Sequence, residues 1–262
     1  MRAFYLAIAA AILAVGVTAI TAQERAAENV GQGKAAMDRA AATQKYVFLF
    51  FWKDKNSQTE KAWSVLESAM TKFADSAEVA SIQITNPSEK KIVDQFGASR
   101  APMPLVLAIA PCGAVTKAFI KTFDEKQLRT AFVSSCTQQC LKALRDRKLV
   151  FVCVVDKDNV QDAMAIPRGV KDFKADAKFG PATEIVLVNA QDKNEATFLN
   201  EIEVGVNAEK PVTVFFAPPG VLVGRFGGAA TKEALVAKLA AAQSNPCAGG
   251  KCGPGGCGPK KK

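Results

Sequence analysis

Residues 45–59, "KYVFLFFWKDKNSQT", pass from an unbroken run of apolar side chains into a short polar segment. An apolar run rich in aromatic and β-branched residues is typical of a buried strand, so we expect a strand over residues 46–52. Beyond the polar segment, apolar residues return at helical spacing: Ala62, Val65, Leu66, Ala69, Met70 and Phe73. The stretch therefore predicts a strand, a short loop and the start of a helix, a junction where many α/β proteins place functional residues.

A second copy of this stretch lies later in the chain. Residues 148–162, "KLVFVCVVDKDNVQD", align with residues 45–59 without a gap and share Lys, Val, Phe, Asn and Gln at equivalent places. Residues 211–222, "PVTVFFAPPGVL", align in the same way with residues 104–115, "PLVLAIAPCGAV", and share the Ala-Pro-x-Gly turn. Two matches in the same order indicate a tandem duplication.

The periodicity predicts the same order of elements in both halves, which defines an α/β fold with two tandem domains at residues 23–134 and 135–243. The expected elements of the first half are a helical segment within 23–45, strands at 46–52 and 78–85, helices at 57–75 and 87–97, a hairpin at 104–121 and a closing helix at 124–135. Those of the second half are a helix at 136–148, strands at 149–155 and 183–190, a helical stretch at 160–176 interrupted at Pro167, a short helix at 195–202, a hairpin at 211–226 and a final helix at 231–242. At the boundary, we expect Ser135 to cap the following helix, with Gln138 completing a capping box.

This order, with a proline entering the first strand of each hairpin, resembles the thioredoxin fold, and it does so twice over residues 23–242. The resemblance implies that Pro104 and Pro211 follow cis peptide bonds and face the loop that carries the redox residues of that family. Pro102 is the competing candidate in the first half.

In thioredoxins, a Phe-Trp pair at the strand end precedes a Cys-x-x-Cys motif that opens the helix. Phe51 and Trp52 match that pair, and residues 56–59, "NSQT", occupy the motif positions. Residues 159–162, "NVQD", occupy them in the second half. The resemblance therefore implies a redox loop in each domain that has no cysteine.

Disulfide chemistry at this loop needs a thiolate made acidic by the helix N-terminus and a second thiol to resolve the mixed disulfide. Asn and Thr supply neither. The buried acid of the family, which helps to move protons, maps by the resemblance onto Phe50 and Cys153, and we expect Cys153 to be a small buried hydrophobe. Neither domain is therefore predicted to be a dithiol oxidoreductase.

The polar residues that replace the motif have two interpretations. Asn is among the best N-cap residues, so Asn56 and Asn159 are expected to cap the helices that follow them. Alternatively, they belong to a peptide or ligand groove beside the cis prolines, formed by Trp52, Asn56, Thr59 and Pro104 in the first domain and by Asn159, Asp162 and Pro211 in the second.

The composition narrows the functional classes. The sequence contains no histidine, which excludes Ser-His-Asp and Cys-His catalysis and imidazole metal ligands. The formal net charge is +9, but Lys and Arg are spread along the chain outside the terminal "GPKKK", without interleaved aromatic residues. We therefore expect a solvated basic surface and no nucleic-acid partner.

The N-terminus, "MRAFYLAIAAAILAVGVTAITAQE", has a basic Arg2, an apolar run and a small Ala22 before polar residues. This pattern predicts a secretory signal peptide over residues 1–22, cleaved after Ala22. The alternative is an uncleaved membrane anchor, because about 20 apolar residues can span a bilayer. Either interpretation predicts an exported protein that is periplasmic, secreted or attached to the cell envelope.

Export makes cysteine pairing possible for the seven cysteines of the chain. Cys136 and Cys140 form a Cys-x-x-x-Cys motif on one face of the predicted helix, and Cys136, near the helix N-terminus, is expected to have a lowered pKa. Copper chaperones with a thioredoxin fold use this spacing, but in their redox loop and with a histidine, so that role does not carry over. One interpretation is structural, with Cys140 packed in the core or with a structural disulfide. The other interpretation is a redox or metal site. Cys112, in the "APCG" turn, is expected to be exposed, either paired or free.

The tail, residues 244–262, repeats cysteine every five residues among Gly and Pro: Cys247, Cys252 and Cys257. Its low apolar content predicts disorder. Three thiolates could bind Cu(I) or Zn(II), although zinc would need a fourth ligand. Disulfides to the body or to other chains, or an inert basic tail, are the alternatives.

The sequence as a whole predicts an exported, redox-inactive tandem protein that binds a protein or peptide partner or acts as a scaffold. Its membrane contact depends on whether residues 1–22 are retained. The alternative is a thiol-disulfide or soft-metal handling protein that uses Cys136, Cys140 and the tail.

Overall fold

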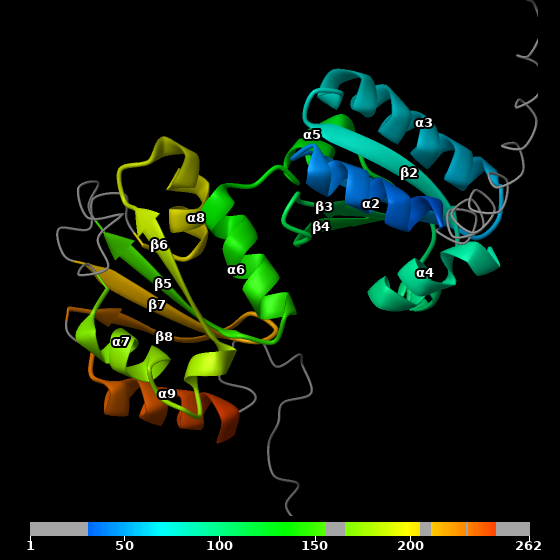
Figure 1. Cartoon of the computed structure of the whole chain (residues 1–262). Helices are drawn as coiled ribbons and strands as arrows, with labels where there is room; N and C mark the ends of the chain where they lie inside the picture. Colours follow the sequence, from blue (N-terminus) through cyan, green and yellow to red (C-terminus); the bar gives the residue numbers. More distant parts are fainter. Residues whose placement is uncertain (1–30, 156–165, 205–210, 229, 245–262) are drawn as a thin grey trace, which may run out of the picture.

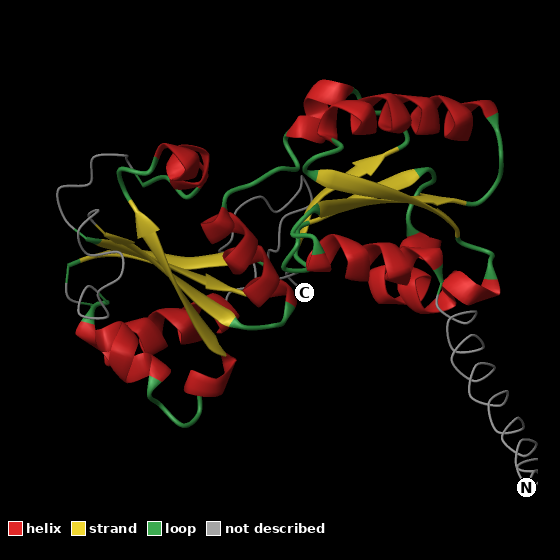
Figure 2. Cartoon of the chain, turned by 45° about the horizontal axis from the view of Figure 1, so that its top comes forward, coloured by secondary structure: helices red, strands yellow, loops and turns green. Residues whose placement is uncertain are grey.

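The computed structural model of the chain describes residues 31–155, 166–204, 211–228 and 230–244. It contains two four-stranded mixed sheets, each flanked by helices (Figures 1 and 2). The predicted signal segment and all tail residues beyond Ser244 lie outside the described residues. Within the described ranges, no helix is both long and apolar enough to cross a membrane.

The first sheet has the strand order β2-β1-β3-β4. Its central strand β1 (Tyr46–Trp52) pairs in parallel with β2 (Ala77–Gln83) and antiparallel with β3 (Leu105–Ile109). Strand β4 (Val115–Ile120) completes the sheet antiparallel to β3. Helices cover both faces of β1, which explains why its sequence is continuously apolar rather than alternating.

The helices of the first domain form two layers. Helices α2 (Gln32–Ala42) and α4 (Lys90–Phe96) pack on the face that carries the odd-numbered side chains of β1. Helices α3 (Ser57–Phe73) and α5 (Glu125–Arg129) pack on the face of the even-numbered ones. Two 3₁₀ turns, η1 (Pro87–Glu89) and η2 (Ala98–Arg100), flank α4, which ends at Gly97 in the left-handed region (φ 61°) that favours glycine.

The second sheet repeats the first with the order β6-β5-β7-β8. Strand β5 (Leu149–Val155) is parallel to β6 (Thr183–Asn189) and antiparallel to β7 (Val212–Ala217), which pairs with β8 (Val221–Gly227). The two stretches predicted to be copies thus form equivalent central strands. The prediction of a mixed α/β architecture built twice is confirmed.

The helices of the second domain follow the same plan. Helices α6 (Ser135–Arg145) and α8 (Ala196–Glu201), the latter preceded by η6 (Lys193–Glu195), pack on one face of the sheet. Helices α7 (Arg168–Lys174) and α9 (Lys232–Ser244) pack on the other. Helix α7 begins after Pro167, as the interrupted helical pattern predicted. Gly169 allows α7 to approach the start of α9, because a Cβ atom there would lie 1.9 Å from the Ala230 carbonyl oxygen.

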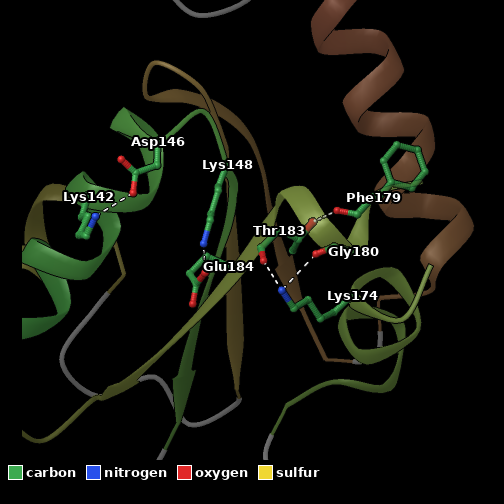
Figure 3. Close-up of polar contacts among 8 residues, drawn as sticks. All are labelled: Lys142, Asp146, Lys148, Lys174, Phe179, Gly180, Thr183 and Glu184. Carbon is green, nitrogen blue, oxygen red and sulfur yellow. Dashed lines mark hydrogen bonds and ion pairs between the residues drawn. The ribbon is translucent and has the colours of Figure 1, made fainter. Parts of the chain in front are cut away.

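Polar contacts fix the connection from α7 into β6 (Figure 3). The Lys174 ammonium donates hydrogen bonds to the carbonyl oxygens of Gly180, at 3.1 Å, and of Thr183. The Thr183 hydroxyl in turn donates to the Phe179 carbonyl oxygen at 2.7 Å. These bonds hold the 3₁₀ turn η5 (Gly180–Ala182) against the end of α7.

Helix α6 lies between the two sheets in both views (Figures 1 and 2) and contacts both domains. One face, with Cys140, belongs to the core of the second domain, while Leu141 packs against the core of the first. The Tyr46 hydroxyl accepts a hydrogen bond from the Gln138 side-chain amide at 3.0 Å. The guanidinium of Arg145 donates to the Gly113 carbonyl oxygen in the β3–β4 turn. Helix α6 is therefore the first helix of one domain and a cover for the end of the other.

Two local predictions near this helix are wrong. The N-cap residue of α6 is Ser134, whose hydroxyl accepts the Thr137 amide, and Gln138 turns towards Tyr46 instead of completing a capping box. The closing helix predicted at 124–135 ends at Arg129. It ends early because the chain turns into the core, where Ala131 is fully buried and the Phe132 ring packs 4.8 Å from that of Tyr46.

Candidate functional site

The start of α3 is held by the side chain of Asn56. Its Oδ1 accepts the backbone N–H groups of Gln58, at 3.1 Å, and Thr59, at 2.9 Å, so the prediction that Asn56 caps this helix is confirmed. The Thr59 hydroxyl donates to the Asp54 carbonyl oxygen at 2.9 Å, which closes the polar loop. Asn56 is exposed and Thr59 is buried. The first position of the four-residue motif thus faces solvent and the fourth faces the core.

We expect Asn56→Ala to lower the free energy of unfolding by about 1 kcal/mol, because two N–H groups of the helix lose their acceptor. Urea denaturation followed by tryptophan emission would measure the loss. Asn56→Ser is the matched control, since serine caps helices comparably well. Equal stability of the two variants would contradict the capping role.

A pocket of about 410 Å³ lies beside this helix start. The aromatic pocket, as we call it, is formed by the end of β1, the loop after it, the first two turns of α3 and the edge strand β2. Its lining residues are Phe50, Trp52, Lys55, Thr59, Glu60, Trp63 and Ser81. Its volume is within the range of small-molecule and side-chain binding sites.

The walls of the aromatic pocket are fixed by specific contacts. The rings of Phe50 and Trp63 meet edge to face with their centroids 5.2 Å apart. The Trp52 indole N–H donates to the Ser81 hydroxyl at 2.9 Å, which ties the end of β1 to β2. The Lys55 ammonium lies 5.9 Å from the centroid of the Trp52 ring, within cation–π range. Trp52 and Trp63 are the two tryptophans of the chain.

The second domain does not repeat these walls. The gap-free alignment places Cys153 opposite Phe50 and Val155 opposite Trp52, and when continued it places Ile166 opposite Trp63. Strand pairing confirms the equivalence at β2, since Phe50 pairs with Ser81 and Cys153 with Leu187. The duplicated scaffold therefore carries its aromatic rings at this place only in the first domain.

The residues of the predicted groove lie at several separate places in the structure. Trp52 and Thr59 line the aromatic pocket, whereas Asn56 is exposed beside it. Pro104 follows a cis bond from Met103 and is buried at the same end of the sheet as Trp52, because Phe51 pairs with Leu105. In the second domain, Pro211 is exposed directly before β7. Asn159, Asp162 and the bond preceding Pro211 lie outside the described residues.

The prediction of a lowered pKa for Cys136 is wrong. Burial, together with the neighbouring Glu195 carboxylate, raises the pKa of this thiol to about 12. The helix N-terminus does not offset these effects, because Ser134 and Glu195 already accept its N–H groups, including that of Cys136 at 3.4 Å. Cys136 is therefore a protonated thiol at neutral pH.

Glu195 has a counterpart in the first domain. Glu89, equally buried in η1, accepts the Gly33 amide at 3.2 Å near the start of α2. Asn86 and Asp192, three residues earlier in each case, cap the two 3₁₀ turns. The buried glutamate at the first helix is thus part of the duplicated scaffold, which supports a structural role for the residues around Cys136.

The other described cysteines are not paired either. Cys140 and Cys153 are buried, and burial raises their pKa values to about 12 and about 11. Cys140 is thus packed, and Cys153 is the buried hydrophobe that the sequence predicted. Cys112 is exposed, with its Sγ 3.9 Å from the Gln138 carbonyl oxygen. The described ranges hold no group of three potential metal ligands, and Cys247, Cys252 and Cys257 lie outside them.

Comparisons with known proteins identify no family for this chain. No protein-family model and no curated protein matches the chain. Among solved structures, thioredoxin O2 from Arabidopsis thaliana matches at 11% identity and a TM-score of 0.31, over 37% of this chain and 81% of its own. The germline-specific thioredoxin Deadhead from Drosophila melanogaster matches at 18% identity and a TM-score of 0.31, over 38% and 90%.

The class of the protein therefore rests on its own strand order. A parallel strand pair followed by an antiparallel hairpin, with helices on both faces, occurs twice, and each copy has the thioredoxin-like arrangement. The structure therefore shows two tandem domains with a thioredoxin-like fold.

Proposed function

We propose that this protein is a redox-inactive binding protein whose first domain receives a side chain of a peptide or protein partner in the aromatic pocket. The observation that carries the proposal is the pairing of two features at one helix start. At the positions that the resemblance assigns to the dithiol, Asn56 caps α3 and the Thr59 hydroxyl closes the preceding loop, and three aromatic side chains line a pocket beside them.

Three of the described thiols support a role without disulfide chemistry. Cys136, Cys140 and Cys153 all have raised pKa values, so they are protonated at neutral pH and poor nucleophiles. Incubation of the full chain with insulin and dithiothreitol tests this part directly. We expect no acceleration of insulin reduction over dithiothreitol alone, and turnover that disappears in Cys136→Ser would contradict the proposal.

The proposal places the protein outside the cytoplasm, on the basis of the signal-like residues 1–22. In the proposed arrangement, the second domain contacts the first through α6, and the opposite end of the first sheet stays open to a partner. Mass spectrometry of the chain from its natural source would test export. Loss of residues 1–22 supports it, and an intact N-terminus in a cytosolic fraction contradicts it.

Trp63→Ile, which introduces the residue of the second domain, is expected to weaken binding of phenylalanine-containing peptides. Tryptophans at the centre of an interface often contribute at least about 2 kcal/mol, which corresponds to about a 30-fold loss of affinity. Titrations followed by the emission of the remaining Trp52 would measure it. Trp63→Phe, which keeps an aromatic wall, should lose less. Identical affinities of the wild type and Trp63→Ile would place the binding elsewhere.

A further inference from the structure

The aromatic pocket accepts an apolar group more readily than a polar one. Two polar hydrogens of its inner lining are already used, since the Trp52 N–H donates to the Ser81 hydroxyl and the Thr59 hydroxyl donates to the Asp54 carbonyl oxygen. A polar group that entered would lose its water without gaining these donors as partners. An aromatic or long aliphatic side chain has no hydrogen bonds to water to lose, and it buries its apolar surface against three rings.

The mouth of the pocket carries charges of both signs, and the sum of these charges is positive. Lys55 projects over Trp52 and has no carboxylate within 4 Å among the described residues. Lys53, Asp54 and Lys61 are exposed next to them in the sequence, so that the three lysines and two acids of residues 53–61 sum to +1. Glu60 lies in the first turn of α3, where the positive end of the helix macrodipole partly offsets its charge. A ligand therefore meets the Lys55 ammonium, unpaired within the described ranges, at the rim and an apolar interior.

We propose that the pocket recognises a peptide segment in which an aromatic or long aliphatic side chain is flanked by acidic residues. The apolar side chain enters between Trp52 and Trp63, and a flanking carboxylate pairs with Lys55. This inference rests on the proposed function and specifies its ligand. The described part of the second domain has no aromatic ring at the positions of the two tryptophans, which are Val155 and Ile166 there.

The test uses the full chain and three blocked pentapeptides, Gly-Asp-Phe-Asp-Gly, Gly-Lys-Phe-Lys-Gly and Gly-Asp-Ala-Asp-Gly. None contains tryptophan, so the emission of the protein comes only from Trp52 and Trp63 in the pocket. We expect the acidic phenylalanine peptide to bind about tenfold more tightly than the basic one at low salt, because charge complementarity favours it. The gap should narrow as salt is added, and the alanine peptide should not bind.

Two variants identify the residue responsible. Lys55→Glu should abolish or invert the preference for the acidic peptide, whereas Lys117→Glu, an exposed change on the opposite edge strand β4, should leave it unchanged. Equal binding of both phenylalanine peptides, or a preference that survives Lys55→Glu, would overturn the ligand class but leave the proposed function standing. No change of emission with any peptide would overturn both.

Discussion

A variant carrying Asn56→Cys and Thr59→Cys is expected to accelerate the reduction of insulin by dithiothreitol, whereas we expect no acceleration by the parent chain. The exposure of the two side chains matches what a dithiol pair needs. The side chain of Asn56 is exposed, as an attacking thiol must be, and that of Thr59 is buried directly behind it, as a resolving thiol must be.

The thiolate introduced by Asn56→Cys should be stabilised by the groups that now bind Asn56. The N–H groups of Gln58 and Thr59 point at the Asn56 oxygen at 3.1 and 2.9 Å, and α3 extends its dipole over 17 residues behind them. Cysteines at helix N-termini have pKa values well below the usual value of about 8.5. Alkylation with iodoacetamide as a function of pH, followed by mass spectrometry of the peptide that contains position 56, would measure this pKa in the variant separately from the other thiols of the chain.

The turnover of this variant should nevertheless be slow. By the resemblance, Phe50 stands where thioredoxins keep a buried acid, so this position supplies no carboxylate to move the proton of the resolving thiol. Phe50→Asp on top of the double variant should therefore raise the rate further, provided that the protein still folds. Asn56→Ser with Thr59→Ser is the matched control, because serine has the shape of cysteine but carries a hydroxyl in place of the thiol. A double cysteine variant that folds but is no faster than this control would show that the loop geometry is not that of a dithiol site.

The strands could be predicted from the sequence because their signal is local. Both central strands are uninterrupted apolar runs, and the structure places them at residues 46–52 and 149–155 as expected. The cap at Asn56 was predictable for the same reason, since its partners are two and three residues away. Local periodicity and capping chemistry were therefore sufficient to predict most of the helices and strands.

The misassigned features depend on residues that are far apart in the chain. The N-terminus of α6 is neutralised by Glu195, and the spacing of Cys136 and Cys140 gives no sign of that carboxylate. The hydroxyl of Ser134, the actual cap, bonds to this same glutamate. A helix dipole lowers a thiol pKa only where its N–H groups are free to act, so the short-range prediction failed.

The aromatic pocket illustrates the same limit. Trp63 follows the buried Ala62 on α3, and its spacing alone does not tell whether it faces a core or an open pocket. Ser81 reaches the site only through the parallel pairing of β1 with β2. One sequence signal was available, because both tryptophans of the chain fall within residues 46–63, and the second copy lacks them.

Phe173→Ala is expected to destabilise the second domain by about 3–5 kcal/mol, the usual cost of removing a fully buried aromatic ring. Phe173 is completely buried, and its ring packs against those of Phe151, Phe179 and Phe215 at centroid distances of 5.1, 4.7 and 5.7 Å. Far-UV circular dichroism in urea reports both domains and should show an early transition. Lys171→Ala, an exposed change on the same helix, should stay within about 0.5 kcal/mol of the wild type.

Tryptophan emission shows whether the destabilisation of the second domain extends to the first, because both tryptophans belong to the first domain. If α6 unfolds with the second domain, the first domain loses the packing of Leu141 and the hydrogen bond from Gln138 to Tyr46. We therefore expect the emission transition of Phe173→Ala to move to lower urea as well, by a smaller amount than the dichroism transition. An emission transition that stays at its wild-type midpoint would show that the two domains unfold independently. In that case α6 would be a contact between two separate units and not a shared structural element.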